Sequence, residues 1–310
     1  MPLVVISSKR FVDHVTPAGH PERPERAQAL SAVAAAFKEQ GGEVIEPRAA
    51  TDEDLLRVHT QEHVDAIFAT RGKATMIDED TFTSPDSDEI ARLAAGAVLT
   101  GVDRVLDGPA GSRAIVLVRP PGHHAEADRA MGFCLYSNIA VGAAYARSRG
   151  CARVAIVDYD VHHGNGTQWI FYEDPTVLFV SSHQYPFYPG TGAASEKGRG
   201  EGLGFTLNIP LDAGAKDDEI ERKYAEQVIP ALRNFKPDLL MISAGFDAHE
   251  MDPLGQLRMT TEGFGRLTKT LIDLAGQVCE GRVVLVTEGG YDLEALSSSL
   301  KAVIAAASLP

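Results

Sequence analysis

The residues best suited to chemistry lie in the stretch DYDVHHG, where Asp158, Asp160 and His162 alternate directly after the apolar run VAIV. If the chain stays extended there, these three side chains project to one face. One imidazole with carboxylates suits zinc, and Fe(II) or Mn(II) take the same ligands. We therefore expect Asp160 and His162 to share one ion with Asp247, which follows another apolar run. Taken alone, the stretch could also be a hydrogen-bonded strand end without metal.

Polar residues follow further apolar runs in the same way. His123 and His124 come after AIVLV, SSHQYP follows TVLFV, Asp247 follows LLMIS, and Tyr291 follows VVLV. In parallel sheets the carboxyl ends of the strands meet at one edge, where sites form. Hydrolysis at a metal needs a base for water and a donor for the developing oxyanion. Because a lone His or Tyr at a strand end is usually structural, the prediction depends on convergence of these residues.

The elements that must position these residues alternate along the whole chain. Nearly continuous apolar runs are typical of strands covered on both faces, and strand–helix alternation indicates a parallel sheet. We predict one α/β domain over residues 1–310, an open parallel sheet with helices on both faces. The predicted strands are Leu3–Ile6, Ala114–Val118, Val154–Val157, Val177–Val180, Phe205–Ile209, Leu239–Ile242 and Val283–Val286, and the predicted helices are Pro24–Gln40, Asp88–Leu106, Asn138–Arg149, Asp218–Phe235, Thr261–Cys279 and Asp292–Ala307.

Composition narrows the class of protein further. The 310 residues are 44% hydrophobic and carry a formal net charge of −14, which disfavours nucleic acid and anionic membranes and favours cationic substrates. Three cysteines without CxxC spacing (Cys134, Cys151 and Cys279) exclude a disulfide framework and suit a reducing cytosol. The N-terminal residues MPLVVISSKRF lack the apolar core of a signal peptide, and no run approaches the ~20 residues of a spanning helix. We expect a cytoplasmic protein.

Six motifs occur in fixed order along the chain: RPPGHHAE, GFC, DYDVHHGNGTQ, YPGTG, GFDAHEMDPLG and EGGYDLEAL. In order and spacing they resemble the histone deacetylase family, most closely its class II and bacterial amidohydrolase branch. The resemblance extends from His20 to Leu296. It implies an arginase-like open α/β fold and a zinc-dependent amidohydrolase that removes an acetyl group from lysine or a similar primary amine.

The resemblance also implies a role for each matching position. Asp160, His162 and Asp247 match the metal ligands, with Zn²⁺ expected and Fe²⁺ as the alternative. His124 matches the general base and acid, and His123 its electrostatic partner.

Three further residues match groups that surround these histidines. Asp158 matches the carboxylate that orients His123. Asn165 stands where class I enzymes have an Asp facing His124, which should leave that imidazole less biased toward its charged form. Tyr291 matches the tyrosine that polarises the substrate carbonyl.

The substrate tunnel and the structural cations follow by the same comparison. Phe133, after Gly132, and Tyr188 match the aromatic walls of an acyl-lysine tunnel. Leu254 occupies the position where the polyamine-specific branch has Glu, and Leu favours acetyl-lysine. The implied potassium sites would involve Asp158, Asp160, His162 and Ser181 for the inner ion and Phe171 and Val177 for a second.

Several alternatives stay open at this point. The same machinery would serve an acetylpolyamine deacetylase, the DxDxH run would suit a binuclear manganese hydrolase with Asp252 as a spare ligand, and a relative without turnover would bind acetylated ligands. Bacterial relatives are often oligomers, so a homo-oligomer is expected. The remaining histidines are assigned as follows: solvated loops for His14 and His20, surface or capping positions for His59, His63 and His249, and a buried hydrogen-bonded position for His163.

Overall fold

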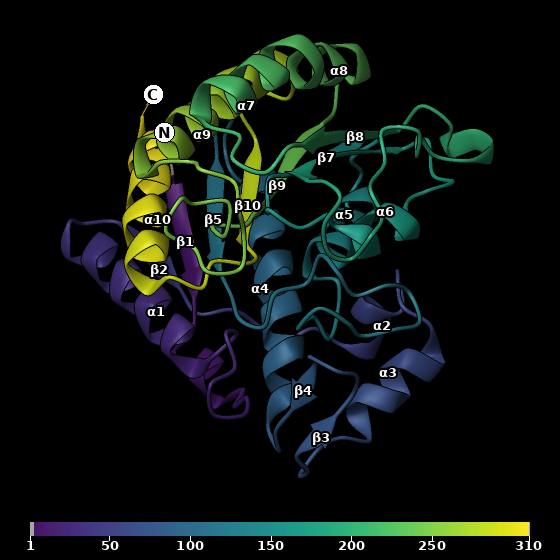
Figure 1. Cartoon of the computed structure of the whole chain (residues 1–310), viewed down its shortest axis with the longest axis vertical. Helices are drawn as coiled ribbons and strands as arrows, with labels where there is room; N and C mark the ends of the chain where they lie inside the picture. The colour runs from purple at the N-terminus through teal and green to yellow at the C-terminus, as the bar shows by residue number, and fades with distance from the viewer. Residues whose placement is uncertain (1–2, 310) are drawn as a thin grey trace.

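One parallel sheet runs through the computed structural model, which describes residues 3–309 (Figure 1). Its strands lie in the order β2-β1-β5-β10-β9-β6-β7-β8, and every neighbouring pair is parallel. A separate antiparallel pair, β3 with β4, lies outside it. The bounds are β1 (Leu3–Ser7), β2 (Glu43–Ile45), β3 (Thr75–Met76), β4 (Phe82–Thr83), β5 (Arg113–Leu117), β6 (Val154–Asp158), β7 (Val177–Gln184), β8 (Thr206–Leu211), β9 (Leu239–Ala244) and β10 (Val283–Thr287).

Helices cover both faces of this sheet, as predicted. On one face α1, α7 to α10 and the sheet share a large apolar cluster, and on the other α4 and α5 pack against it. A π-helical turn, Tyr224–Val228, joins α7 to α8, so the predicted helix 218–235 is continuous. The bounds are α1 (Pro24–Glu39), α2 (Asp52–Leu55), α3 (Gln61–Phe68), α4 (Ser87–Leu106), α5 (Asn138–Ser148), α6 (Asn165–Ile170), α7 (Asp217–Lys223), α8 (Ile229–Phe235), α9 (Thr261–Val278) and α10 (Leu293–Ser308).

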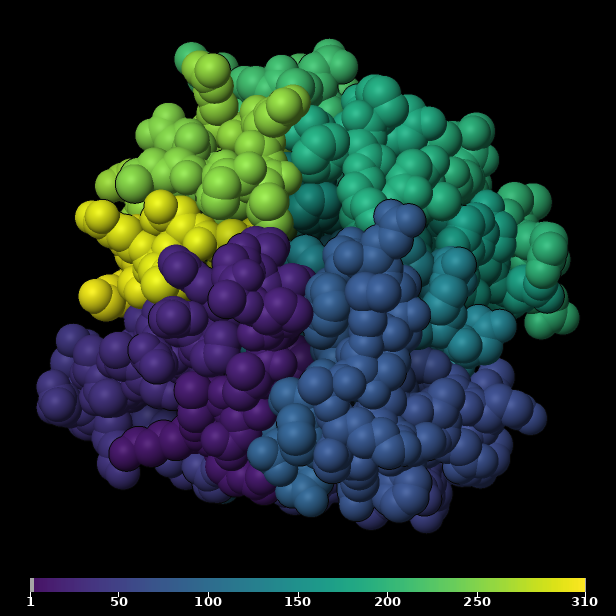
Figure 2. Space-filling view, turned by 60° about the horizontal axis from the view of Figure 1, so that its bottom comes forward, coloured from purple at the N-terminus to yellow at the C-terminus, as the bar shows by residue number. Residues whose placement is uncertain are grey.

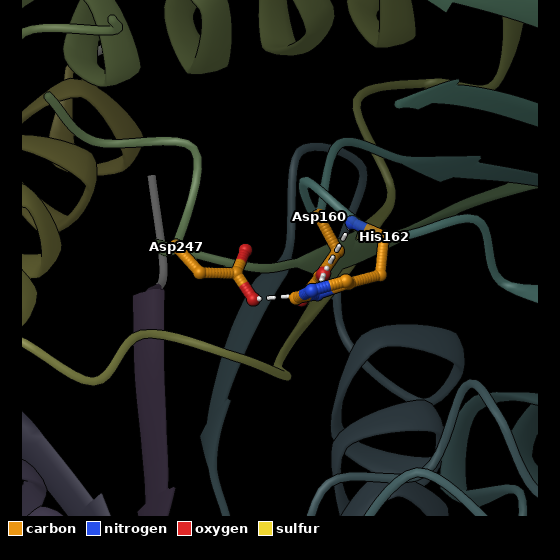
Figure 3. Close-up of side chains that lie close together, drawn as sticks. All are labelled: Asp160, His162 and Asp247. Carbon is orange, nitrogen blue, oxygen red and sulfur yellow. Dashed lines mark hydrogen bonds and ion pairs between the residues drawn. The ribbon is translucent and has the colours of Figure 1, made fainter. Parts of the chain in front are cut away.

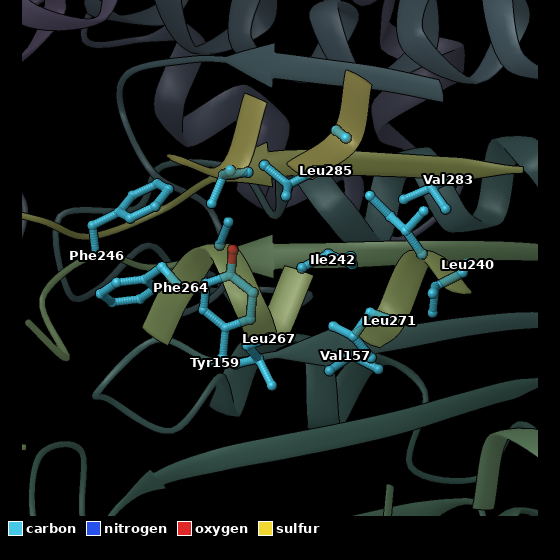
Figure 4. Packing of buried hydrophobic residues seen from close by; sticks show 14 of the residues in the cluster. Val157, Tyr159, Leu240, Ile242, Phe246, Phe264, Leu267, Leu271, Val283 and Leu285 are labelled. Carbon is cyan, nitrogen blue, oxygen red and sulfur yellow. The ribbon is translucent and has the colours of Figure 1, made fainter. Parts of the chain in front are cut away.

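The core explains why the continuous apolar runs are strands. Leu240 and Ile242 of β9 pack beneath α9, which contributes Phe264, Leu267 and Leu271 (Figure 4). Every residue of β5, β6, β9 and β10 is buried, because helices cover both sides. These central strands therefore hold the loops at their carboxyl ends in fixed positions.

All seven predicted strands of the sheet are present, whereas its edge strand β2 was not predicted. Its three residues, EVI, are partly exposed at the edge of the sheet, so they carry no apolar pattern. Within residues 3–309, no helix is long and apolar enough to cross a membrane.

Candidate active site

Asp160, His162 and Asp247 lie together in the loops that follow β6 and β9 (Figure 3). His162 Nδ1 is 3.1 Å from Asp160 Oδ1 and 3.2 Å from Asp247 Oδ2. One ligand atom from each residue lies within 4.8 Å of the others, and this is the only such group in residues 3–309. The predicted convergence of two carboxylates and one imidazole is therefore present.

Backbone N–H groups hold the two carboxylates in place. Asp160 accepts hydrogen bonds from the N–H of His162 at 2.9 Å and of Gly289 at 2.9 Å, and Asp247 accepts one from Val161 at 3.0 Å. A Cβ at Gly289 would lie 2.0 Å from Asp247 Oδ2, so only glycine fits against the two carboxylates. The site thus brings two buried carboxylates together beside one imidazole, which fits a bound cation.

The pKa values in this group reflect that excess of carboxylate. Burial, together with the charge of Asp160, raises the pKa of Asp247 to about 7. Burial disfavours a charged imidazole at His162, but hydrogen bonds to Asp160 and Asp247 outweigh it and raise its pKa to about 10. A divalent cation would relieve the same repulsion between the carboxylates. The donor set of one imidazole nitrogen and two carboxylates suits zinc and leaves positions open for other ligands.

Asp158 is not part of the Asp160–His162–Asp247 group. The expectation of an extended chain is wrong beyond this residue, because β6 ends at Asp158 and the backbone bends at residues 160–162. The Asp158 carboxylate instead accepts a hydrogen bond from His123 Nδ1 at 2.9 Å. His163 is buried and hydrogen-bonded to Thr191 and Gln168, as predicted.

His123 and His124 lie side by side, with ring centroids 4.0 Å apart, but in opposite electrostatic surroundings. Burial opposes charge on His123, yet the carboxylates of Asp160 and Asp158 outweigh it and hold its pKa well above the usual value. Burial and the neighbouring imidazoles lower the pKa of His124 well below the usual value. The pair therefore holds one charged and one neutral ring.

A buried amide fixes the tautomer of His124. Its Nδ1 lies 2.7 Å from Asn165 Oδ1, while Asn165 Nδ2 donates to Glu126 Oε1 at 2.8 Å. Because the amide nitrogen is engaged with Glu126, its oxygen faces the imidazole and accepts the Nδ1 proton. Nε2 of His124 is then a free acceptor.

A cavity of about 120 Å³ reaches these groups from the surface. The segments that supply its residues surround a hollow in the space-filling view (Figure 2). Tyr188 is 39% exposed and stands at the mouth, with its ring perpendicular to that of His124 at 5.2 Å. Tyr291 is buried at the inner end beside Phe133, at a centroid distance of 5.8 Å. The lining residues are Asp80, His124, Gly132, Phe133, His162, Tyr188, Leu254 and Tyr291.

Several residues of the site were not found from the sequence. Phe187 stacks on the His162 ring at 5.3 Å, and Asp80 lines the cavity. Arg26 donates to the carbonyls of Gly290 and Glu288, both at 2.6 Å. Phe187 directly precedes Tyr188 in the sequence, and this adjacency could have identified it. Arg26 lies more than 260 positions from its partners, so the sequence gave no signal for it.

Asp252, the spare ligand considered for a second metal, is used elsewhere. Its carboxylate accepts hydrogen bonds from the backbone N–H groups of Leu254, Tyr291 and Asp292. It is also absent from the one metal-type cluster within residues 3–309.

The residues expected around potassium are buried. Ser181 pairs with Asp158 in the sheet register, and its hydroxyl lies 2.9 Å from His183 Nδ1. The side chains of Phe171 and Val177 belong to the apolar core, so only backbone carbonyls there could bind an ion. Potassium binding stays a prediction.

Five histidines were predicted in solvated, surface or capping positions, and four of them are buried. His14, His59, His63 and His249 are each at most 5% exposed. Their rings are hydrogen-bonded inside the fold; His59 Nε2, for example, accepts the N–H of Ser137 at the start of α5, so a capping role holds for it. His20 is partly exposed and contacts Phe133 edge-on.

Comparison with known proteins agrees with this geometry. Residues 20–307 match the histone deacetylase domain. Histone deacetylase 10 of rice (chloroplastic) is 40% identical over 302 residues, 91% of this chain and 68% of the rice protein. A probable deacetylase of Archaeoglobus fulgidus is 38% identical over 293 residues, 94% of this chain and 81% of that protein. The crystal structure of the HDA15 HD domain superposes with a TM-score of 0.92 at 40% identity, covering 98% of this chain and 88% of that one.

The chain therefore belongs to the histone deacetylase family, and its fold is the arginase- and deacetylase-like one expected. A domain match over most of the chain makes it a hydrolytic deacetylase.

Proposed function

We propose that this chain is a zinc-dependent amidohydrolase that removes an acetyl group from the side chain of lysine or from a similar primary amine. The observation that carries the proposal is the convergence of the Asp160–His162–Asp247 group, His124 and Tyr291, three of whose residues line one narrow cavity. Zinc, with Fe²⁺ as the alternative, would be held by this group and would supply Lewis acidity toward water and the amide carbonyl.

His124 is the general base in this proposal. Its Nδ1 proton is engaged by Asn165, so Nε2 can accept a proton from the attacking water and later donate it to the leaving amine. The charge on His123, held by Asp158, helps to keep His124 neutral before the reaction begins. Asn165 and Asp158 therefore act by orienting the two imidazoles.

Tyr291 is the proposed donor to the oxyanion. Burial, followed by the charge of Asp247, raises the pKa of its phenol well above the usual value, so the hydroxyl keeps its proton. A protonated hydroxyl beside the metal group can donate to the carbonyl oxygen as charge develops there. Phe133 and Tyr188 would enclose the methylene chain of the substrate, whose burial is favourable.

Acetylpolyamines are the second candidate substrates. The net charge of −14 and the carboxylate of Asp80 at the cavity favour a cationic ligand. Leu254, however, places an apolar side chain at the cavity rather than a carboxylate that could bind a distal ammonium. This contact favours acyl-lysine.

The test is hydrolysis of an acetyl-lysine peptide series and of acetylspermidine by metal-free protein, with Zn²⁺ or Fe²⁺ then added back under anaerobic conditions. We expect release of acetate from acetyl-lysine only when the metal is present. Full turnover after complete chelation would refute metal dependence. Tight binding of acetylated peptides without hydrolysis of any of them would favour the non-catalytic alternative.

A further inference from the structure

The carboxylate of Asp252 joins two loops that line the cavity. It is 6% exposed, and its Oδ1 accepts a hydrogen bond from the N–H of Leu254 at 2.9 Å. Its Oδ2 accepts two more, from the N–H of Tyr291 at 2.6 Å and of Asp292 at 3.1 Å. One side chain thus holds the backbone of two residues that contact the cavity directly.

The turn that carries Tyr291 needs such support. It contains two consecutive glycines, and Gly290 has a φ of 126°, a conformation that other residues rarely adopt. On its carbonyl side the turn is held by Arg26, which donates to Gly290 and Glu288. On its N–H side the partner is Asp252. Without that carboxylate, the buried N–H of Tyr291 and the partly buried N–H of Asp292 would lose their acceptor.

We infer that Asp252 is a positioning residue that fixes the Tyr291 hydroxyl and the Leu254 side chain relative to the metal group. This inference rests on the proposed function, because it assigns Tyr291 a part in turnover. Asp252 acts through the backbone of these two residues and does not touch the substrate. Its three hydrogen bonds need both carboxylate oxygens, so an amide, which has only one acceptor, cannot replace it.

A competing explanation for any effect of Asp252 is electrostatic. Its charge acts on Asp247 and favours the protonated form of that ligand. Removing the charge would then alter metal affinity and leave the position of Tyr291 unchanged. The two explanations predict different results when substitutions at Asp252 and Tyr291 are combined.

The experiment is a double-mutant cycle with Asp252→Asn and Tyr291→Phe in the zinc-loaded full chain, measured as kcat and KM on an acetyl-lysine peptide. A displacement of about 1 Å at a reacting group can cost ~10²-fold, so Asp252→Asn should lower kcat by ~10- to 100-fold. In the Tyr291→Phe background the same change should lower kcat by less than about threefold, because the hydroxyl it positions is gone. Equal losses in both backgrounds, or wild-type kcat in Asp252→Asn, would overturn the inference.

Zinc affinity, measured by competition with a chelating dye, distinguishes positioning from the electrostatic explanation. We expect the zinc affinity of Asp252→Asn to equal that of the parent protein. A loss of kcat that follows a loss of zinc affinity would overturn the inference. Asp252→Glu keeps the charge but displaces the carboxylate, and it should also lose kcat; wild-type kcat in this variant would favour the electrostatic explanation. Asp252→Glu also provides the test of positioning if Asp252→Asn does not fold. The matched control is Asp292→Asn, which removes one charge at the residue after Tyr291 and keeps a good N-cap for α10.

A spectroscopic readout separates this inference from the proposed function. 3-Fluorotyrosine placed only at position 291 should give one ¹⁹F resonance in the parent protein and in Asp292→Asn, and a shifted or split resonance in Asp252→Asn. A spectrum unchanged by Asp252→Asn would refute the positioning even in a protein with no detectable turnover. Lack of turnover in the zinc-loaded parent protein, with the ¹⁹F change present, would refute the proposed function and leave the positioning intact.

Discussion

Replacing Tyr291 with Phe removes one hydroxyl and leaves the ring. The ring contacts persist, namely Phe133 at 5.8 Å and the Arg26 guanidinium at 5.0 Å from the centroid. Within residues 3–309 the hydroxyl has no hydrogen-bond partner in the protein, so its loss leaves no buried group unpaired. We therefore expect the free energy of unfolding to change by less than about 0.5 kcal/mol.

The effect on turnover should be large, because Tyr291 is buried, lines the cavity and lies close enough to Asp247 and Asp160 for their charges to act on its phenol. Loss of one oxyanion donor in such surroundings costs ~10²–10³ in kcat, equivalent to ~2.7–4 kcal/mol of transition-state stabilisation. KM should change much less, since the ground-state carbonyl carries little charge.

The assay is steady-state hydrolysis of an acetyl-lysine peptide by zinc-loaded protein, with zinc content and thermal midpoint measured on the same sample. Tyr172→Phe makes the same chemical change outside the cavity and should keep the kcat of the parent protein. If Tyr291→Phe kept kcat within about threefold at full zinc content, the reasoning about this hydroxyl would be wrong.

Three further predictions concern specificity, the buried ion cluster and acid stability. Leu254→Glu should shift the kcat/KM ratio of acetylspermidine to acetyl-lysine by ~10- to 100-fold toward the polyamine, as expected for a hydrogen bond to a charged group, and an unchanged ratio would contradict this. Glu22→Gln leaves the buried guanidiniums of Arg26 and Arg119 without their shared carboxylate, so urea denaturation should show a loss of about 3–5 kcal/mol, and an unchanged midpoint would contradict it. Burial lowers the pKa of His59 to about 3, so the unfolded state alone takes up its proton as the pH falls below about 6.5. The free energy of unfolding should therefore fall by about 1.4 kcal/mol per pH unit more in the parent protein than in His59→Gln, and equal slopes would refute this.

The strands were predictable because strands buried on both faces have continuous apolar sequences. VAIV and LLMIS are covered on both faces by helices, so almost any polar residue there would be costly. The short α6 was not predicted, because NGTQWI carries neither an apolar period nor a helix-favouring start. Local patterns thus locate elements whose own residues face the core.

The site was predictable in its residue types and only partly in its geometry. Carboxylates and imidazoles at strand ends predicted convergence, because parallel strands end at one edge. The direction of Asp158 was not predictable, since it depends on where β6 stops and the backbone bends. Arg26 and Asp80 also left no local signal, because their roles arise from contacts with segments far along the chain. Long-range packing is the part that spacing does not encode.

The two buried carboxylate clusters are balanced in different ways. Glu22 is matched by two guanidiniums, those of Arg26 and Arg119, and needs no further cation. Asp160 and Asp247 instead accept backbone N–H groups and share the His162 imidazole, and His123 Nε2 lies 3.8 Å from Asp160, so imidazoles and not guanidiniums lie against these carboxylates. Burying two neighbouring carboxylates is costly, and a bound divalent ion would offset that cost. Because backbone N–H groups already orient both carboxylates, metal binding should need little rearrangement of the loops that carry these ligands.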